Sequence, residues 1–454
     1  MDSNLVLVVH CVDTEGPLYE STAATFERLE KTFGVRLKPT LEQLDRLKQG
    51  LDLEPSVRSS VMDFLSDDRL NYNRSWADVD AMLRDMMRPE WRLQYSDDFG
   101  NGYAFNWFIL DHVGFEINPR QRALGYHAVY EHYLEFLQEY APPMDRLYWH
   151  NHPVSFFHEA HKTSNNFSYT NHHVQVLSRR VIDYLDFPVA YRPGCHCERP
   201  DINLFLEMWI PFDYGNQGMP ERAEDRAQKD VSGGRYGDWR RATSEWEVYH
   251  PDFYDYQSKG GMKRHVARCL NLNSRLRPVT EEEITKAFAR ASSGKPTILS
   301  VTNHDEREMR PYIAQFMGDV RNVQKKFPDV KIRHANAVDA IRLAEGLVRK
   351  DPVNLSFSWD GPRLDVKTNS SIWGPQPWLC FKTHDKRYIH ENFDFQEPGE
   401  SWSYVFDEDT IQLDQVECIG VATNDDYGNT SVYRLYPDRN LDKTEVMHRN
   451  EPVL

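Results

Sequence analysis

The sequence has little cysteine, and its cysteines do not form a disulfide framework. Six cysteines are scattered over 454 residues, whereas disulfide-stapled domains are short and dense in cysteine. Cys195 and Cys197 form a C-x-C pair, but no second pair completes a zinc–thiolate site. We therefore expect reduced cysteines, as is typical of a cytoplasmic protein.

Long apolar runs and an excess of positive charge are also absent. No stretch approaches the roughly 18 apolar residues of a membrane-spanning helix. The first run, Leu5–Val9, has no basic residue before it, so we expect a first strand and not a signal peptide. The 54 basic residues against 70 acidic ones give a net charge of −16, which argues against a general nucleic-acid surface.

The chain is long enough for two domains, and strand and helix patterns alternate over residues 1–350. One helix is expected at 280–294, where Thr280 and Glu283 have the spacing of a capping box. The helical, polar stretch 39–102 is too long for one crossover and is interpreted as an insertion. The alternation predicts a parallel α/β barrel with insertions. Its predicted strands are Leu5–Val9, Ala104–Leu110, Arg146–Trp149, Val189–Tyr191, Trp209–Phe212, Thr297–Val301 and Val330–Ile332.

The pattern changes at residue 352. Apolar residues from Val353 to Trp359 alternate with polar ones, and similar short runs recur up to Tyr436. Half-buried strands at this spacing predict a small all-β sandwich over residues 352–454. The tryptophans of this domain have two interpretations, a sugar-binding face or core packing, and core packing is favoured. The tryptophans concerned are Trp359, Trp373, Trp378 and Trp402.

Polar side chains directly follow several of the predicted barrel strands. Because sites in α/β barrels gather at the carboxyl ends of the strands, one polar residue there means little, but the joint pattern predicts a functional site. The residues are Asp13 and Glu15 in "VDTEG", His150 and His152 in "LYWHNHP", Arg192 in "YRPG", Asp213 in "PFDYG", and His304 and Asp305 in "VTNHDE".

His150 and His152 have a spacing that suits metal binding. In extended backbone, side chains at i and i+2 point the same way. Two imidazoles and one carboxylate with open positions suit a catalytic Zn²⁺ or a related divalent ion, such as Co²⁺, Ni²⁺ or Mn²⁺. The second of the two acids, Asp13 and Glu15, is then available as a general base.

These motifs resemble those of the polysaccharide deacetylase superfamily, also called the NodB-homology or carbohydrate esterase family 4 fold. The resemblance covers about residues 4–345 and is carried by short motifs. It implies a distorted (β/α)7 barrel with a divalent metal. On the family pattern, Asp13 is the base and Glu15 the ligand, with His150 and His152 in an H-x-H-P variant of the second motif.

The resemblance also implies further roles. Arg192 orients the base, His304 is the general acid, and Asp213 matches the acid that often follows the Arg motif. The implied reaction is hydrolysis of an N-acetyl or similar N-acyl group on a sugar or nucleotide-linked sugar, in surface-glycan biosynthesis. We expect a carbohydrate substrate, no nucleic acid and no membrane span, and we leave a homo-oligomer open.

Several alternatives remain open at the level of sequence. Asp13 and Glu15 could exchange roles, and His158 and His161 are rival ligands. The barrel could also be a degenerate glycan-binding scaffold, or could hydrolyse a non-sugar amide or a glycosidic bond.

Other residues are candidates for the neighbourhood of the site. Arg235 and Trp239, in the Gly-rich and Arg-rich loop 232–241, and Asp305 are candidate substrate contacts. Asp111 and His112 could also enter the site.

Overall fold

The structure is a computed structural model that describes residues 4–115, 118, 120–152, 170–220, 237–272, 274, 276–348, 351–437 and 444–449. Three candidates named above, Arg235 and the rival ligands His158 and His161, lie outside the described residues.

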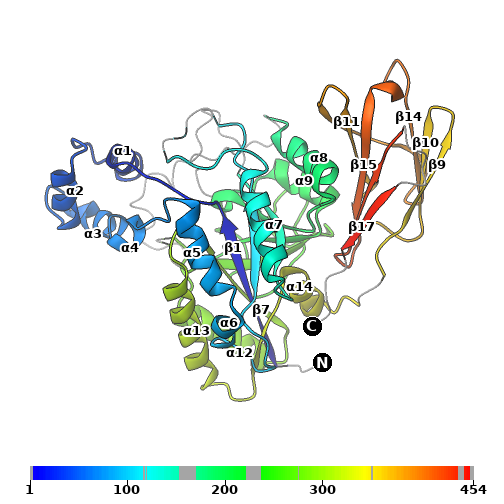
Figure 1. The fold of residues 1–454 in the computed structure, drawn as a ribbon. Helices are drawn as coiled ribbons and strands as arrows, with labels where there is room; N and C mark the ends of the chain where they lie inside the picture. Colours follow the sequence, from blue (N-terminus) through cyan, green and yellow to red (C-terminus); the bar gives the residue numbers. More distant parts are fainter. Residues whose placement is uncertain are drawn as a thin grey trace.

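A parallel barrel forms the larger part of the molecule (Figure 1). Strand β1 pairs with β7 on one side and with β2 on the other, which closes a seven-stranded ring. Strand β8 pairs with the first half of β1, at Leu5–Val8, whereas β2 pairs with the second half, at His10–Thr14. The predicted parallel α/β barrel is therefore confirmed. Its strands are β1 (Leu5–Thr14), β2 (Phe105–Leu110), β3 (Arg146–Asn151), β4 (Ala190–Pro193), β5 (Phe212–Asn216), β6 (His265–Asn271), β7 (Thr297–His304) and β8 (Lys331–His334).

Alternation along the strands sorts side chains between the inside and the outside of the barrel. On β1, Leu7, Val9 and Cys11 belong to an interior cluster, whereas Val8 and Val12 pack in the outer layer with the helices. Asp13, at the carboxyl end of β1, continues the series Leu7, Val9 and Cys11 and therefore points into the barrel.

Helices cover the barrel and form the insertion. Helices α7, α12 and α13, which follow β2, β6 and β7, pack in the outer layer. Helix α14 packs against the interior cluster. The predicted insertion consists of α2 to α6. The helices are α1 (Thr22–Phe33), α2 (Leu41–Lys48), α3 (Pro55–Phe64), α4 (Asp67–Leu70), α5 (Trp76–Met86), α6 (Pro89–Leu93), α7 (Ala128–Tyr140), α8 (His172–Tyr184), α9 (Pro200–Trp209), α12 (Glu281–Ser292), α13 (Arg310–Gln324) and α14 (Ala337–Glu345).

Two parts of the strand prediction need correction. The run Trp209–Phe212 was expected to be a strand, but α9 ends at Trp209 and β5 begins only at Phe212. Trp209 and Ile210 are apolar because they pack in a core cluster beneath the second domain. Strand β6 was not predicted, because His265 and Arg268 interrupt its apolar pattern; Arg268 is buried against Glu283.

The C-terminal part consists of two antiparallel sheets that share a core. The smaller sheet has the order β13-β14-β10-β9 and the larger one β12-β11-β15-β16-β17. The strands are β9 (Leu355–Asp360), β10 (Arg363–Thr368), β11 (Trp378–Thr383), β12 (Tyr388–Glu391), β13 (Asp394–Glu397), β14 (Ser401–Val405), β15 (Val416–Asn424), β16 (Thr430–Leu435) and β17 (Glu445–Arg449).

The larger sheet is buried on both faces. On β11, Leu379 and Phe381 point into the core between the sheets, whereas Trp378 and Cys380 pack against the barrel side, beside α8 and α9. Of the four tryptophans considered above, Trp373, Trp378 and Trp402 are buried, so they serve packing. No helix in the described part of the chain is long and apolar enough to cross a membrane.

Candidate metal centre

Three side chains from two strand ends converge at the carboxyl end of the barrel. One ligand atom each from Glu15, His150 and His152 lies within 4.8 Å of the other two. The two His Nε2 atoms are 3.1 Å apart, and His152 Nε2 lies 3.7 Å from Glu15 Oε1. Ligand bonds of about 2.0–2.2 Å to one ion place donor atoms roughly 3–3.5 Å apart, so the cluster has the right size for a divalent ion.

The backbone fixes the tautomer of His150. Its Nδ1 lies 3.0 Å from the carbonyl oxygen of Arg192, to which it can only donate. The neutral imidazole therefore keeps its lone pair on Nε2, which faces His152. Such a hydrogen bond behind a histidine ligand is the usual support of a metal site.

Gly194 makes room for the second imidazole. A Cβ atom added there would lie 2.2 Å from His152 Cδ2 and 2.4 Å from its Cγ. This glycine begins the 3₁₀ turn Gly194–His196 (η2) that follows β4. The turn and the His152 ring are therefore packed together so closely that only hydrogen fits between them.

Asp13 lies beside the cluster of Glu15, His150 and His152 and is held by a bidentate pair with Arg192. Arg192 Nε and Nη2 donate to the two Asp13 oxygens at 2.6 and 3.0 Å, and Nη1 donates to the Tyr214 carbonyl at 2.7 Å. Burial opposes ionisation of Asp13, but the Arg192 guanidinium and then His150 outweigh it, so the pKa lies below its ordinary value. Asp13 is therefore an oriented carboxylate at neutral pH.

Glu15 is the other carboxylate, and its partner was not predicted from the sequence. Arg122 contacts Glu15 Oε2 and also pairs with Glu306 at 2.7 Å. Burial opposes ionisation of Glu15, but Arg122 outweighs it and the pKa falls to about 2. No motif surrounds Arg122 in the sequence, so only the fold could reveal it.

His304 completes the rim of the site from β7. Its register partner on β1 is Asp13, and its Nε2 lies 3.9 Å from Asp13 Oδ2 and 3.6 Å from Glu15 Oε1. Its side chain is 34 % exposed, against 1 % for His150. His304 is thus the group of the cluster that a molecule arriving from solvent would meet.

Asp305 and His112 form hydrogen bonds with the backbone of Glu15 and Gly16. Asp305 Oδ1 accepts the Glu15 N–H at 2.8 Å, Oδ2 accepts the Gly16 N–H at 3.0 Å, and Tyr133 donates to Oδ2 at 2.8 Å. His112 Nε2 lies 2.9 Å from the Glu15 carbonyl oxygen. Asp305 was expected at the substrate, but it is fully buried and its carboxylate is already bonded.

His196 is a neighbour of the site that sequence reasoning missed. Burial and then the charge of Arg192 lower its pKa well below the ordinary value; His304 and His150 lower it further, whereas Asp13 opposes the shift. Its backbone is left-handed, at φ 52°, as is that of Cys195 at φ 49°. Trp239, expected at the substrate, is instead buried and donates its indole N–H to the His196 carbonyl at 2.8 Å.

The structure does not bring Asp213 or Asp111 to the cluster. Asp213 precedes the interior residue Tyr214 on β5, so strand alternation turns it outward. There it pairs with Arg264 at 2.6 Å. Asp111 pairs with Arg180 at 3.1 Å and accepts the indole N–H of Trp149 at 2.9 Å.

The ionisation states of Glu15, His150 and His152, as well as the spacing of their ligand atoms, suit a divalent metal ion. Burial lowers the pKa of His150, and burial together with His150 lowers that of His152 to about 3. Both imidazoles are therefore neutral at pH 7, while Glu15 is ionised, which are the forms that bind metal.

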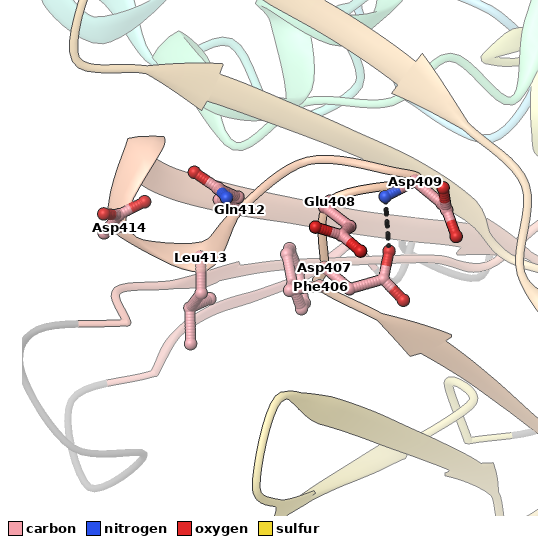
Figure 2. Close-up of a pocket in the computed structure, with 7 residues that line it drawn as sticks. All are labelled: Phe406, Asp407, Glu408, Asp409, Gln412, Leu413 and Asp414. Carbon is pink, nitrogen blue, oxygen red and sulfur yellow. Dashed lines mark hydrogen bonds between the residues drawn. The ribbon is translucent and has the colours of Figure 1, made fainter.

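An open hollow of about 530 Å³ lies elsewhere, in the β14–β15 connection of the C-terminal domain (Figure 2). Its lining is acidic, but Asp407 is already used in the turn: its Oδ1 accepts the N–H groups of Asp409 and Thr410 at 3.0 and 3.2 Å. We assign it no function.

No protein-family model matches the chain, and no curated protein matches it. Among solved structures, a Cellulomonas fimi endo-beta-1,4-mannanase double mutant is similar over 81 % of this chain and 89 % of its own. The identity is 9 % and the TM-score 0.26, and a likeness of this size supports no argument about activity.

Proposed function

We propose that this chain is a metal-dependent hydrolase of the NodB-homology type that removes an N-acetyl or similar N-acyl group from a sugar or nucleotide-linked sugar. One observation carries the proposal. A cluster of two neutral histidines and one ionised glutamate lies beside a second carboxylate that is held separately by arginine.

The two acids have different partners, and this difference supports separate roles for them. Glu15 faces His152, whereas both carboxylate oxygens of Asp13 accept hydrogen bonds from Arg192. We therefore assign metal binding to Glu15 and the general base to Asp13. A divalent ion at the cluster would supply Lewis acidity toward an acyl carbonyl and toward water.

The reaction needs two proton movements. Asp13 takes a proton from the water that attacks the acyl carbon. As the C–N bond breaks, a protonated His304 gives its proton to the leaving nitrogen, so the products are an amine and a carboxylic acid. Arg192 keeps Asp13 ionised and aimed, and is a positioning residue.

The test is hydrolysis of N-acetylated sugars and nucleotide-linked sugars by the Zn²⁺-loaded protein, with the loss of one acetyl group followed by mass spectrometry. Asp13→Asn and His304→Ala should each lower kcat by about 10²- to 10⁴-fold, the usual contribution of a general acid or base. His384→Ala, at an exposed position of the C-terminal domain, is the control and should keep full activity. Equal activity in Asp13→Asn and His384→Ala would refute the assignment.

A further inference from the structure

A second cluster of potential metal ligands lies away from the proposed active site. His250, His265 and Glu345 each offer one ligand atom, and these atoms lie within 4.8 Å of one another. His265 is the first residue of β6, whereas His150, Glu15 and His304 stand at the carboxyl ends of their strands. Because all barrel strands are parallel, the two clusters lie at opposite ends of the barrel.

We propose that this second cluster is a structural site for a divalent transition-metal ion, with Zn²⁺ the first candidate. It would fasten the segment around His250 to β6 and to the end of α14. It is independent of the proposed hydrolase function.

The orientation of His250 supports the proposal. Its Nδ1 lies 3.0 Å from the Lys263 carbonyl oxygen and 3.1 Å from that of Arg264. Facing two acceptors, Nδ1 carries the proton, so the lone pair is on Nε2. That nitrogen is turned toward Glu345 Oε2, 3.9 Å away, as in histidine ligands that a backbone carbonyl orients.

The second imidazole lacks a partner that its burial demands. His265 is 6 % exposed, and its Nδ1 has no hydrogen-bond partner within the part of the chain that the structure describes. A buried nitrogen without a partner is costly. Its Nδ1 also lies 3.9 Å from Glu345 Oε2, too far for a hydrogen bond but suited to an ion between them.

The backbone holds the two rings together. Tyr249 and Val266 form an antiparallel bridge, with N–H to O distances of 3.0 and 2.8 Å in the two directions. The bridge places His250 beside His265, with ring centroids 4.6 Å apart. The histidines are thus preorganised, whereas Glu345 is exposed and can close the remaining distance by a change of rotamer.

The third ligand comes from a favourable place. Glu345 is the last residue of α14, whose C-cap Gly346 is left-handed. A cation near a helix carboxyl terminus is stabilised by the helix dipole. Two imidazoles and one carboxylate, with solvent able to supply a fourth ligand, are a common set for Zn²⁺.

The experiment is a Zn²⁺ titration of the full chain after removal of metal with a chelator. The background is His152→Ala, which disables the cluster at the carboxyl end. We expect this protein to bind one equivalent of Zn²⁺ and to melt at a higher temperature when Zn²⁺ is present. Adding His250→Ala should weaken that binding by roughly 10–100-fold or more, since even outer partners of ligands cost this much, and should abolish the rise in melting temperature.

Two further variants make the result decisive. Glu345→Gln, at an exposed position, should weaken Zn²⁺ binding in the same background even if His250→Ala folds poorly. His384→Ala is the matched exposed histidine and should change nothing. If the His152→Ala protein binds no Zn²⁺, or if Glu345→Gln and His250→Ala leave binding unchanged, the proposal is wrong.

The same series separates this site from the proposed active site. Loss of one equivalent between the wild type and His152→Ala reports the carboxyl-end cluster, whereas loss of the other with His250→Ala reports this one. Either can fail while the other stands.

Discussion

At the scale of single residues, the arrangement of Glu15, His150 and His152 depends on the absence of a side chain at Gly194. Gly194 leaves the space in which the His152 ring lies, and any Cβ there would overlap the imidazole. The position of one candidate ligand, His152, is thus set by a residue that has no side chain.

Gly194→Ala should therefore push His152 away from His150 and lower the affinity of the carboxyl-end cluster for Zn²⁺ by more than about tenfold. Zn²⁺ titration of the His250→Ala background measures this cluster alone. Gly261→Ala is the matched control, because a Cβ there meets nothing within 4 Å. Equal affinities in the two variants would contradict the packing argument.

A buried histidine gives a prediction on pH. His10 is fully buried. Its Nδ1 lies 2.9 Å from Tyr103 Oη and its Nε2 2.9 Å from Asn303 Oδ1. Burial lowers the pKa of His10 from 6.5 to about 4. Between these values the unfolded chain takes up a proton that the folded chain does not, so stability falls as pH falls.

The free energy of unfolding of the metal-free protein, from urea titrations, should drop by about 1–2 kcal/mol more between pH 7 and pH 5 than that of His10→Gln. Glutamine can keep both hydrogen bonds but does not titrate. An equal drop in the two proteins would show that His10 takes up its proton in the folded state too.

Much of the site could be foreseen because it follows one rule. Asp13, Glu15, His150, His152 and His304 all come after apolar runs, and the carboxyl ends of parallel strands meet. Two kinds of residue were not predicted correctly from the sequence. Supporting partners such as Arg122 and Gly194 carry no local pattern, and Asp213 was misplaced because its side depends on where β5 begins.

At the scale of elements, the larger sheet of the C-terminal domain differs from the half-buried strands expected there, because both of its faces are buried. Strand β11 is apolar at consecutive positions because one face packs within the sandwich and the other on α8 and α9. Such strands lose the alternation that identifies them. Strand β6 was not predicted because the charged Arg268 interrupts its apolar pattern. The Arg268 side chain points outward and is buried by its ion pair with Glu283.

Among the side chains between the C-terminal domain and the barrel, removal of Trp378 should cost the most free energy of unfolding. It is fully buried, and its ring lies against Trp209 at 5.0 Å and His390 at 4.0 Å between centroids. Trp378→Ala should lower the free energy of unfolding by about 3–5 kcal/mol. Phe395→Ala, at a position 51 % exposed, should change it by less than about 0.5 kcal/mol.

Chemical denaturation of both variants measures the difference. A Trp378→Ala protein as stable as Phe395→Ala would mean that the two parts of the molecule contribute little to each other.

At the scale of the whole molecule, the barrel and the C-terminal sheets share a core and not merely a linker. The shared cluster contains Trp149 and Leu177 from the barrel side and Val432 from β16. Polar bonds accompany it: Asn424 donates to the carbonyls of Pro188 and Trp209, each at 2.9 Å.

We therefore expect one cooperative unfolding transition in calorimetry, with the calorimetric and van't Hoff enthalpies equal. A fragment ending at residue 348 should melt at a lower temperature and bind a hydrophobic dye, because its side of the shared cluster becomes exposed. Two resolved transitions, or a fragment as stable as the full chain, would contradict this expectation.

The pairing of β1 with β7 also has a consequence for how the protein is made. The backbone of Glu15 is tied to Asp305, 290 residues later. At the roughly 5–20 residues per second of synthesis, Leu5–Val9 emerges from the ribosome about 15–60 s before its neighbours on that side exist. This short, strongly apolar segment therefore remains without its β7 partner strand for most of the synthesis of the chain, and chaperone binding to it during that time would keep it from aggregating.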